Sequence, residues 1–242
     1  MADDELAFGP DWRVERTLDD GTPLTLRPVT PDDREELAEA IRHLSPETRM
    51  RRFLSAVTEP SEDVLRYLTC VDQDTHVAIA ATVPTPDMKE ERGVGIARFV
   101  RLVGRPDAAE AAVTVVDDMQ GKGVGRHLLT ELAHVAWDKG VRCFRAEVLS
   151  SNQPMRAILT QVGARLVAQE GDVVIFEVDL EGEPADRAVG RLRELLRGAA
   201  TSMAGLIRRM MPESVALRVS DGAAPAEHEG ERERDDRAER SE

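Results

Sequence analysis

The 242-residue sequence is poor in cysteine, in aromatic residues and in positive charge, and each shortage excludes a class of protein. The only cysteines, Cys70 and Cys143, form neither a CxxC pair nor a framework, which excludes a disulfide scaffold and a zinc knuckle. Aromatic residues make up 3 % of the chain, so its core must be built from Leu, Val, Ile and Ala. Hydrophobic residues make up 41 %, which is enough for a globular core.

Acidic residues outnumber basic ones by 46 to 32, which gives a formal net charge of −14. Such a chain lacks the clustered Lys and Arg that bind phosphate backbones, so we expect no nucleic-acid partner. No apolar run approaches the ~18 residues that span a bilayer, so we expect no transmembrane segment. The acidic start, residues 1–5, lacks the features of a secretory signal. The sequence therefore predicts a cytoplasmic protein.

Composition divides the chain into four parts. Residues 22–180 mix apolar runs, turns and charge as a globular domain does, and residues 1–21 are an N-terminal extension. Residues 181–219 contain an amphipathic helix, which we expect to pack on the domain or in a homodimer; a membrane-surface or partner helix is the alternative. Residues 220–242 contain no large apolar residue, so we expect a disordered acidic tail.

Helices and strands alternate within the predicted domain. Apolar spacing and caps predict helices over 31–43, 46–53, 62–69, 123–139 and 154–162. Alternating runs predict strands over 24–27, 76–83, 95–103, 110–116, 143–149, 164–169 and 173–180. This order predicts an α/β fold whose sheet is partly antiparallel.

The most informative segment is a glycine-rich turn between a strand and an amphipathic helix. Gly121, Gly123 and Gly125 leave backbone N–H groups at a helix N-terminus open to close approach by an anion. The Walker loop is excluded because Lys122 is followed by glycine, and the Rossmann loop because the spacing is GxGxG. The turn predicts a phosphate site; a turn that merely permits tight packing is the alternative.

The pattern Gln120-x-x-Gly123-x-Gly125 resembles the pyrophosphate-binding motif of the GNAT N-acetyltransferase superfamily. A second segment, in which a strand leads through Asn152 into a helix, resembles the later half of the same fold. The resemblance covers roughly residues 22–180. It implies a mixed, mostly antiparallel sheet flanked by helices, with a central splayed pair of parallel strands.

The resemblance also implies acetyl-CoA as the co-substrate, with no metal. In this family the pantetheine arm enters the gap between the splayed strands, and a backbone N–H, here near Val115, donates to the thioester carbonyl. Asn152 would face the pantetheine arm; a simple helix cap is its other interpretation. The remaining coenzyme contacts carry over to the strand end and the turn: Val113, Thr114, Val115, Gln120, Gly121, Lys122, Gly123, Val124, Gly125 and Arg126.

Transfer to an amine needs a base, because an ammonium group of pKa about 10.4 is mostly protonated at neutral pH. The run 109–115 resembles the bacterial protein-lysine acetyltransferase branch, in which a Glu at the position of Glu110 is the general base. Glu147 matches a base position of other branches. The third possibility is that neither of these two residues is the base. The structural alternatives are a solvated charge at the start of a strand for Glu110, and an ion pair with Arg145 or Arg165 for Glu147.

One departure from the family pattern concerns the leaving thiolate. Many members place a Tyr on the helix after the Asn to protonate it, and this sequence has Leu159 there, so we assign no general acid. The resemblance implies direct acetyl transfer in a ternary complex, with a protein lysine as acceptor. A small-molecule amine as acceptor, or a non-catalytic acyl-CoA-binding regulatory module, are the alternatives.

Overall fold

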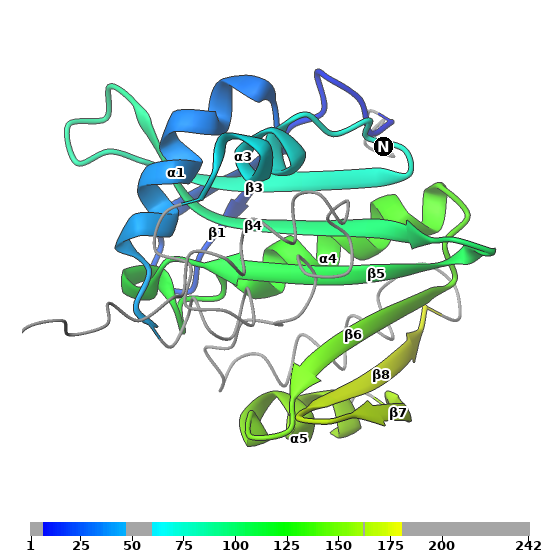
Figure 1. Cartoon of the computed structure of the whole chain (residues 1–242). Coiled ribbons are helices and arrows are strands. Elements are labelled where there is room, and N and C mark those ends of the chain that lie inside the picture. The colour runs from blue at the N-terminus through cyan, green and yellow to red at the C-terminus, as the bar shows by residue number, and fades with distance from the viewer. Residues whose placement is uncertain (1–6, 47–59, 162, 181–242) are drawn as a thin grey trace, which may run out of the picture.

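The computed structural model describes residues 7–46, 60–161 and 163–180 (Figure 1). Most of the helix expected over 46–53 lies outside these residues. So do the amphipathic helix expected within 181–219, with the homodimer assigned to it, and the acidic tail expected over 220–242. These expectations stay predictions.

An eight-stranded sheet in the order β1-β2-β3-β4-β5-β6-β8-β7 forms the centre of the described fold. All neighbouring strands are antiparallel except β5 and β6, which are parallel. The predicted α/β class and mixed, mostly antiparallel sheet are therefore confirmed. The strands are β1 (Val14–Thr17), β2 (Pro23–Pro28), β3 (His76–Pro84), β4 (Glu91–Leu102), β5 (Arg105–Val115), β6 (Cys143–Leu149), β7 (Arg165–Glu170) and β8 (Val173–Asp179).

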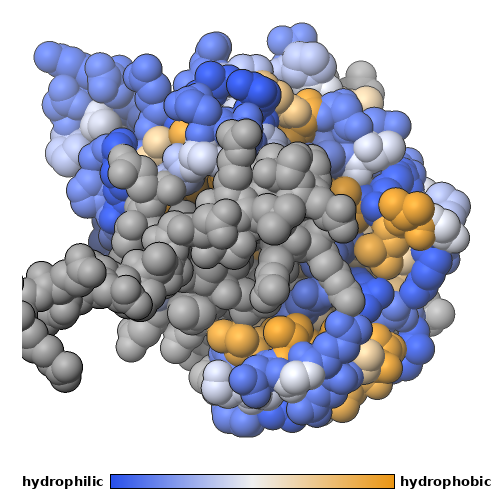
Figure 2. Space-filling view, in the orientation of Figure 1, coloured by the Kyte–Doolittle hydropathy of each residue, from blue (hydrophilic) through white to orange (hydrophobic). Residues whose placement is uncertain are grey.

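Helices cover both faces of the sheet (Figure 1). The short helix η1 (Pro31–Asp33), α1 (Arg34–His43) and α3 (Glu62–Thr69) lie on one face, and α4 (Val124–Asp138) lies on the other. The short helix η2 (Asp117–Met119) follows β5, and α5 (Gln153–Gln161) follows β6. In the view of Figure 2 the described surface is mostly hydrophilic, as expected of a chain with 32 % charged residues.

The main core lies between the sheet and α4. Odd-numbered residues of β5, such as Ala111 and Val113, pack there against Leu128 of α4. Since side chains alternate along a strand, the even-numbered residues Glu110 and Thr114 point to the face that carries α1 and α3. One face of β5 is therefore apolar and the other carries polar side chains, and Glu110 lies on the face opposite the main core.

Helix α4 begins and ends within one residue of its predicted bounds, because glycines mark both ends. Gly123 is its N-cap, with a left-handed φ of 94°. Gly140 has a φ of 83° and donates its N–H to Trp137 O at 2.9 Å. Both conformations cost a residue with a Cβ strain energy that glycine avoids.

Two features of the sheet differ from the sequence-based expectation. Residues 14–17, within the predicted extension, form the edge strand β1, which pairs with β2. Strand β5 begins at Arg105, because a hairpin turn at Gly104 (φ 80°) extends its ladder with β4. Glu110 therefore lies in the middle of a strand, and its placement at a strand start was wrong.

Candidate active site

The parallel strands β5 and β6 pair briefly and then separate. Beyond Glu110 no further register pair joins the described residues of these two strands. Strand β6 instead pairs with β8 along its whole length, and Figure 1 shows both turning away from β5. The splayed parallel pair is confirmed, and Glu110 lies at its vertex. The three pairs formed are Ala108–Cys143, Ala109–Phe144 and Glu110–Arg145.

The backbone of β5 beyond Glu110 presents N–H groups to this gap. The carbonyl of Asp107 accepts a hydrogen bond from Arg142 N at 2.7 Å, immediately before β6. Odd-numbered residues of β5 therefore direct their backbone groups toward β6, since hydrogen-bonding direction alternates along a strand. By this alternation the N–H groups of Val113 and Val115 face the gap, where a thioester carbonyl was expected.

The glycine-rich turn lies at the open end of the gap. Gly121 and Gly123 both adopt left-handed φ values, 78° and 94°. Gly125 lies in the first turn of α4, where a built Cβ would meet Val115 Cγ2 at 3.5 Å. The first N–H groups of a helix have no intrahelical acceptor, so this turn has the geometry of an anion site.

Side chains of the turn divide into structural and exposed ones. Gln120 Nε2 donates to Val115 O at 3.1 Å, which ties the turn to the end of β5. Lys122 is exposed, whereas the side chain of Val124 is buried in the core, so Val124 can offer a ligand only its backbone.

Arg126 is 6 % exposed, and its Nη2 contacts Asp19 Oδ1 at 3.0 Å. Asp19 belongs to the turn between β1 and β2. A Cβ built on Gly123 would lie 3.2 Å from the same Nη2. The guanidinium therefore lies directly beside the glycine turn, as a phosphate contact requires. Nothing near Asp19 in the sequence indicates this contact, which only the folded structure brings about.

Asn152 caps α5 and also retains an unused donor. Its Oδ1 accepts a hydrogen bond from Met155 N at 3.3 Å, so the side-chain oxygen acts as a helix cap. The residue is 5 % exposed, and its Nδ2 is buried without a hydrogen-bond partner in the described structure. A buried amide donor without an acceptor costs free energy, so this nitrogen suits an acceptor group on a ligand.

The two candidate bases are both buried on the face opposite α4. Glu110 is 4 % exposed and Glu147 is 8 % exposed, so the solvated-charge alternative for Glu110 is wrong. Arg165, a suggested partner of Glu147, pairs with Asp179 at 3.1 Å and lies 3.8 Å from Glu177.

Comparison with known proteins decides the family. A model described as an acetyltransferase (GNAT) domain matches residues 23–165, more than half of the chain. The chain belongs to the GNAT acetyltransferase family. The resemblance of the chain to the GNAT superfamily is thereby confirmed.

Relatives of this GNAT domain are acetyltransferases by name. The chain is 39 % identical over 159 residues to acetyltransferase Pat of Mycolicibacterium smegmatis, covering 64 % of this chain and 45 % of Pat. It is 36 % identical over 155 residues to acetyltransferase PA5475 of Pseudomonas aeruginosa, covering 64 % of this chain and 81 % of PA5475. The match therefore spans less than half the length of Pat.

A solved structure supports the same branch. The GNAT domain of S. lividans PAT is 31 % identical and superimposes with a TM-score of 0.64, covering 72 % of this chain and 99 % of that one. The fold of this GNAT domain is thus that of an experimentally known relative.

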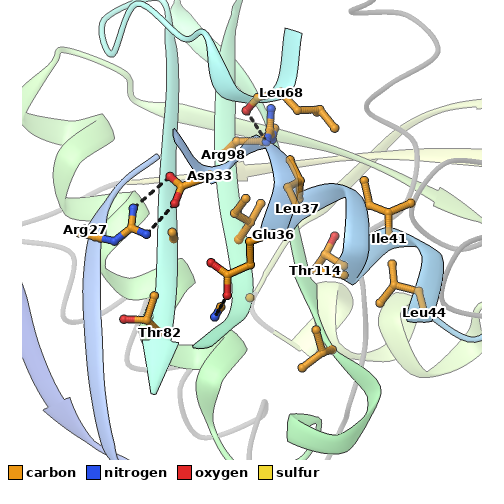
Figure 3. Close-up of a pocket in the computed structure, with 16 residues that line it drawn as sticks. Arg27, Asp33, Glu36, Leu37, Ile41, Leu44, Leu68, Thr82, Arg98 and Thr114 are labelled. Carbon is orange, nitrogen blue, oxygen red and sulfur yellow. Dashed lines mark hydrogen bonds and ion pairs between the residues drawn. The ribbon is translucent and has the colours of Figure 1, made fainter. Parts of the chain in front are cut away.

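A cavity of about 80 Å³ lies in the GNAT domain between α1 and the sheet (Figure 3). Its walls include Leu37 and Ile41 of α1 and the Arg27–Asp33 ion pair, and Thr114 lines it from β5. Thr114 Oγ1 is buried without a hydrogen-bond partner in the described structure. The apolar spacing of the α1 segment predicts a helix and does not indicate a cavity.

A wider groove of about 440 Å³ adjoins this cavity, since Glu36, Ala40 and Gly93 line both. Acidic side chains dominate its rim, and Asp118 there pairs with Arg92 at 2.7 Å. The groove is therefore an opening of moderate negative charge on the face of Glu110.

Cys143 is unsuited to act as a nucleophile, and Leu159 is unable to act as a general acid. Burial, reinforced by nearby Glu177 and Asp179, raises the pKa of the Cys143 thiol to about 11, so it is not a ready nucleophile. Leu159, at the position where many GNAT members have Tyr, is buried at 2 % exposure.

Among the described residues there is no His/Cys/Asp/Glu cluster that could hold a metal. The same residues contain no helix long and apolar enough to cross a membrane.

The residues present fit acetyl-CoA. The positive-φ glycines and the first turn of α4 suit its diphosphate, and the gap beside Val113 and Val115 suits an extended arm. Asn152, which follows the end of β6, supplies a buried Nδ2 donor without a hydrogen-bond partner in the described structure. The predicted coenzyme contacts therefore lie around one gap, with Glu110 at its closed end.

Proposed function

We propose that this protein transfers the acetyl group of acetyl-CoA to the side-chain amine of a protein lysine. Membership of the GNAT family supports acetyl transfer. The relatives named Pat support a protein acceptor. The thioester would lie in the gap between β5 and β6, and the amine would attack it directly in a ternary complex.

The observation that carries the proposal is the end of the β5–β6 ladder at Glu110. It leaves the N–H groups of Val113 and Val115 facing a gap that opens at the glycine turn. An N–H directed at the thioester oxygen stabilises that oxygen more as negative charge develops on it during attack. The same ladder end places a buried carboxylate at the closed end of the gap.

Glu110 is the proposed general base. An acceptor ammonium has to lose a proton before its nitrogen can attack, and Glu110 would take that proton. Glu147 lies on the same face and is the second candidate, because it too is buried near the vertex. The thiolate leaves without an assigned acid, since Leu159 cannot donate a proton.

Coenzyme binding is tested at Gly123. We expect Gly123→Ala to weaken binding of coenzyme A, measured by calorimetry, by about tenfold or more, since its Cβ would lie beside Arg126. Gly140→Ala is the matched control, because it has a similar φ at the other end of α4 with nothing within 4 Å. Equal loss in both variants, or none in Gly123→Ala, contradicts the proposed site.

The base is tested by comparing Glu110→Gln with Glu147→Gln. We expect Glu110→Gln to lose about 10²-fold or more in turnover, because general base catalysis contributes about that much, while coenzyme affinity stays nearly unchanged. Glu147→Gln should keep most of its turnover. Full activity of Glu110→Gln with the wild-type pH profile would show that Glu110 is not the base.

The acceptor is tested by incubating cell lysate with labelled acetyl-CoA and the protein, followed by mass spectrometry. Label on protein lysines supports the proposal. Thioester consumption only with free amines would favour a small-molecule acceptor, for which the acidic groove is the supporting feature. Tight coenzyme binding with no turnover on any acceptor would favour the regulatory module.

A further inference from the structure

Arg98 of β4 is a buried cation without a carboxylate partner. It is 1 % exposed, and no acidic side chain in the described part of the chain forms an ion pair with its guanidinium within 4.0 Å. Its Nη2 donates to Leu68 O at 3.1 Å, its Nη1 lies 3.2 Å from His76 Nε2, and its Nε is buried without a hydrogen-bond partner. Burial lowers the pKa of Arg98 to about 10, so the group stays protonated at neutral pH. Because an uncompensated buried charge costs free energy, this guanidinium suits an anionic ligand.

The side chain of Arg98 lines the cavity of about 80 Å³ between α1 and the sheet (Figure 3). Arg98 and Ile96 lie two residues apart on β4, and Thr114 is the register partner of Ile96, so the three side chains share one face of the sheet. Thr114 also lines the cavity, and its Oγ1 is buried without a hydrogen-bond partner. In the described structure the cavity therefore has two buried polar atoms with unused hydrogen-bonding capacity, Arg98 Nε and Thr114 Oγ1.

The carboxylates that line the cavity are engaged with other groups. Asp33 accepts two hydrogen bonds from Arg27, at 2.6 and 3.0 Å. Glu36 accepts a hydrogen bond from Gly93 N, and both of these residues also line the adjoining groove. Arg98 does not line the groove, so its charge lies in the part of the cavity away from the acidic rim.

The remaining walls are mostly apolar, and they limit the size of a ligand. Leu37, Ile41 and Leu44 of α1 and Ile96 of β4 are among them. Since one water needs roughly 10–15 Å³ of such space, a cavity of about 80 Å³ suits a ligand of about six heavy atoms. Apolar walls disfavour a hydrated inorganic anion and favour an anion that carries an aliphatic part.

We propose that this cavity binds a small organic carboxylate with a short aliphatic chain. The carboxylate oxygens accept hydrogen bonds from Arg98 Nε and Thr114 Oγ1, and the chain packs against Leu37 and Ile41. The proposal concerns the cavity alone, so it does not depend on the proposed acetyl transfer in the gap between β5 and β6.

The first test is an NMR titration of the full chain, labelled with ¹³C in its Ile and Leu methyl groups, with butyrate, 1-butanol and butylammonium. We expect butyrate to shift the methyl signals of Leu37 and Ile41 and to bind at least about tenfold more tightly than the other two, because only a carboxylate pairs with the guanidinium. The methyl signals of Leu166, which is exposed on β7, are the control and should not move. No binding of butyrate, equal binding of the three ligands, or shifts away from the cavity overturn the proposal.

Repeating the butyrate titration with saturating coenzyme A separates the cavity from the coenzyme gap. We expect the affinity for butyrate to change by less than about threefold. Displacement of butyrate by coenzyme A would place it in the gap and overturn the proposal. Binding of butyrate in the cavity of a protein that does not bind coenzyme A would contradict the proposed function and leave this inference standing.

Two variants test the polar atoms of the cavity. Arg98→Met removes the charge and should weaken butyrate binding by about tenfold or more, and Thr114→Val removes the hydroxyl and should weaken it by about three- to tenfold. Arg66→Met, which removes an exposed arginine of α3, is the control and should bind butyrate as the wild type does. Unchanged affinity in Arg98→Met overturns the proposal. If that variant does not fold, Thr114→Val decides in the same way.

Discussion

Single residues in this domain are constrained most tightly where α4 meets the sheet. A Cβ built on Gly95 of β4 would lie 2.9 Å from Leu128 Cδ1 and 3.0 Å from the backbone oxygen of Thr114. The backbone atom cannot move without shifting β5. The glycine therefore permits the close approach of the sheet to α4, the helix that begins at the glycine turn.

We expect Gly95→Ala to lower the free energy of unfolding by about 1–3 kcal/mol, because it overpacks this contact. The measurement is chemical denaturation followed by circular dichroism. Gly9→Ala is the control, since its Cβ would make only an ordinary contact at 3.7 Å. Similar stability of the two variants would show that α4 can move away from the sheet at little cost.

The two cysteines should differ strongly in reactivity. Cys70 is exposed, and Cys143 is buried with its thiol pKa raised to about 11. We expect maleimide at pH 7.5 to label Cys70 rapidly and Cys143 slowly. Intact-mass spectrometry of the wild type and of Cys70→Ser measures the two labelling rates.

Cys143→Ala should keep acetyl transfer, because the proposed mechanism has no acyl-enzyme. Loss of acetyl transfer in a variant that still folds would contradict direct transfer.

At the scale of elements, an ion pair holds β1 against α4. Glu131 of α4 is 3 % exposed; its Oε1 lies 2.7 Å from Arg16 Nη2, and its Oε2 lies 3.4 Å from His134 Nδ1. Burial opposes ionisation of Glu131, but the His134 hydrogen bond and the Arg16 charge outweigh it and lower its pKa. The pair joins the edge strand to the helix that begins at the glycine turn.

We expect Arg16→Ala to destabilise the fold by about 1–3 kcal/mol, since it leaves a buried carboxylate poorly compensated. The matched control is Arg13→Ala, whose ion pair with Glu91 is largely exposed and should contribute little. Urea denaturation measures both. Equal and small effects would mean that β1 contributes little to holding α4.

For the whole molecule, several carboxyls ionise more easily in the folded state. Burial opposes ionisation of Asp72, but hydrogen bonds from Thr75 and from backbone N–H groups lower its pKa to about 2. Asp33 is half-buried, which also opposes its ionisation, but hydrogen bonds from Arg27 and Thr30 lower its pKa. Since these pKa values lie below the ordinary value of 3.8, their stabilising contribution is complete above that pH and is lost below it.

We therefore expect the melting temperature to fall steeply between pH 4 and pH 2, as measured by calorimetry. Asp72→Asn should be less stable than wild type at pH 7, because an amide cannot replace the hydrogen bonds of a carboxylate, and should lose less between pH 4 and pH 2. An unchanged pH dependence in this variant would show that Asp72 does not contribute to acid sensitivity.

The sequence by itself determined the features that depend on local backbone chemistry. The positive φ of Gly121, Gly123 and Gly140 strongly favours glycine, so the turn and both ends of α4 could be predicted directly from the sequence. The order of strand, turn and helix around Asn152 likewise depends on residues that are neighbours in the sequence. These segments carry the family motif, and for that reason the fold and the family could be predicted.

Only the tertiary structure decided what lies beside Glu110. Its register partner Arg145 is 35 residues away in the chain, and Glu177 lies beyond that, so no local pattern records their pairing. The burial of Glu110, the pairing of Arg16 with Glu131 and the cavity under α1 likewise depend on strand register and helix packing. Periodicity predicts which residues share a face of one element, whereas register across the sheet decides which charges meet.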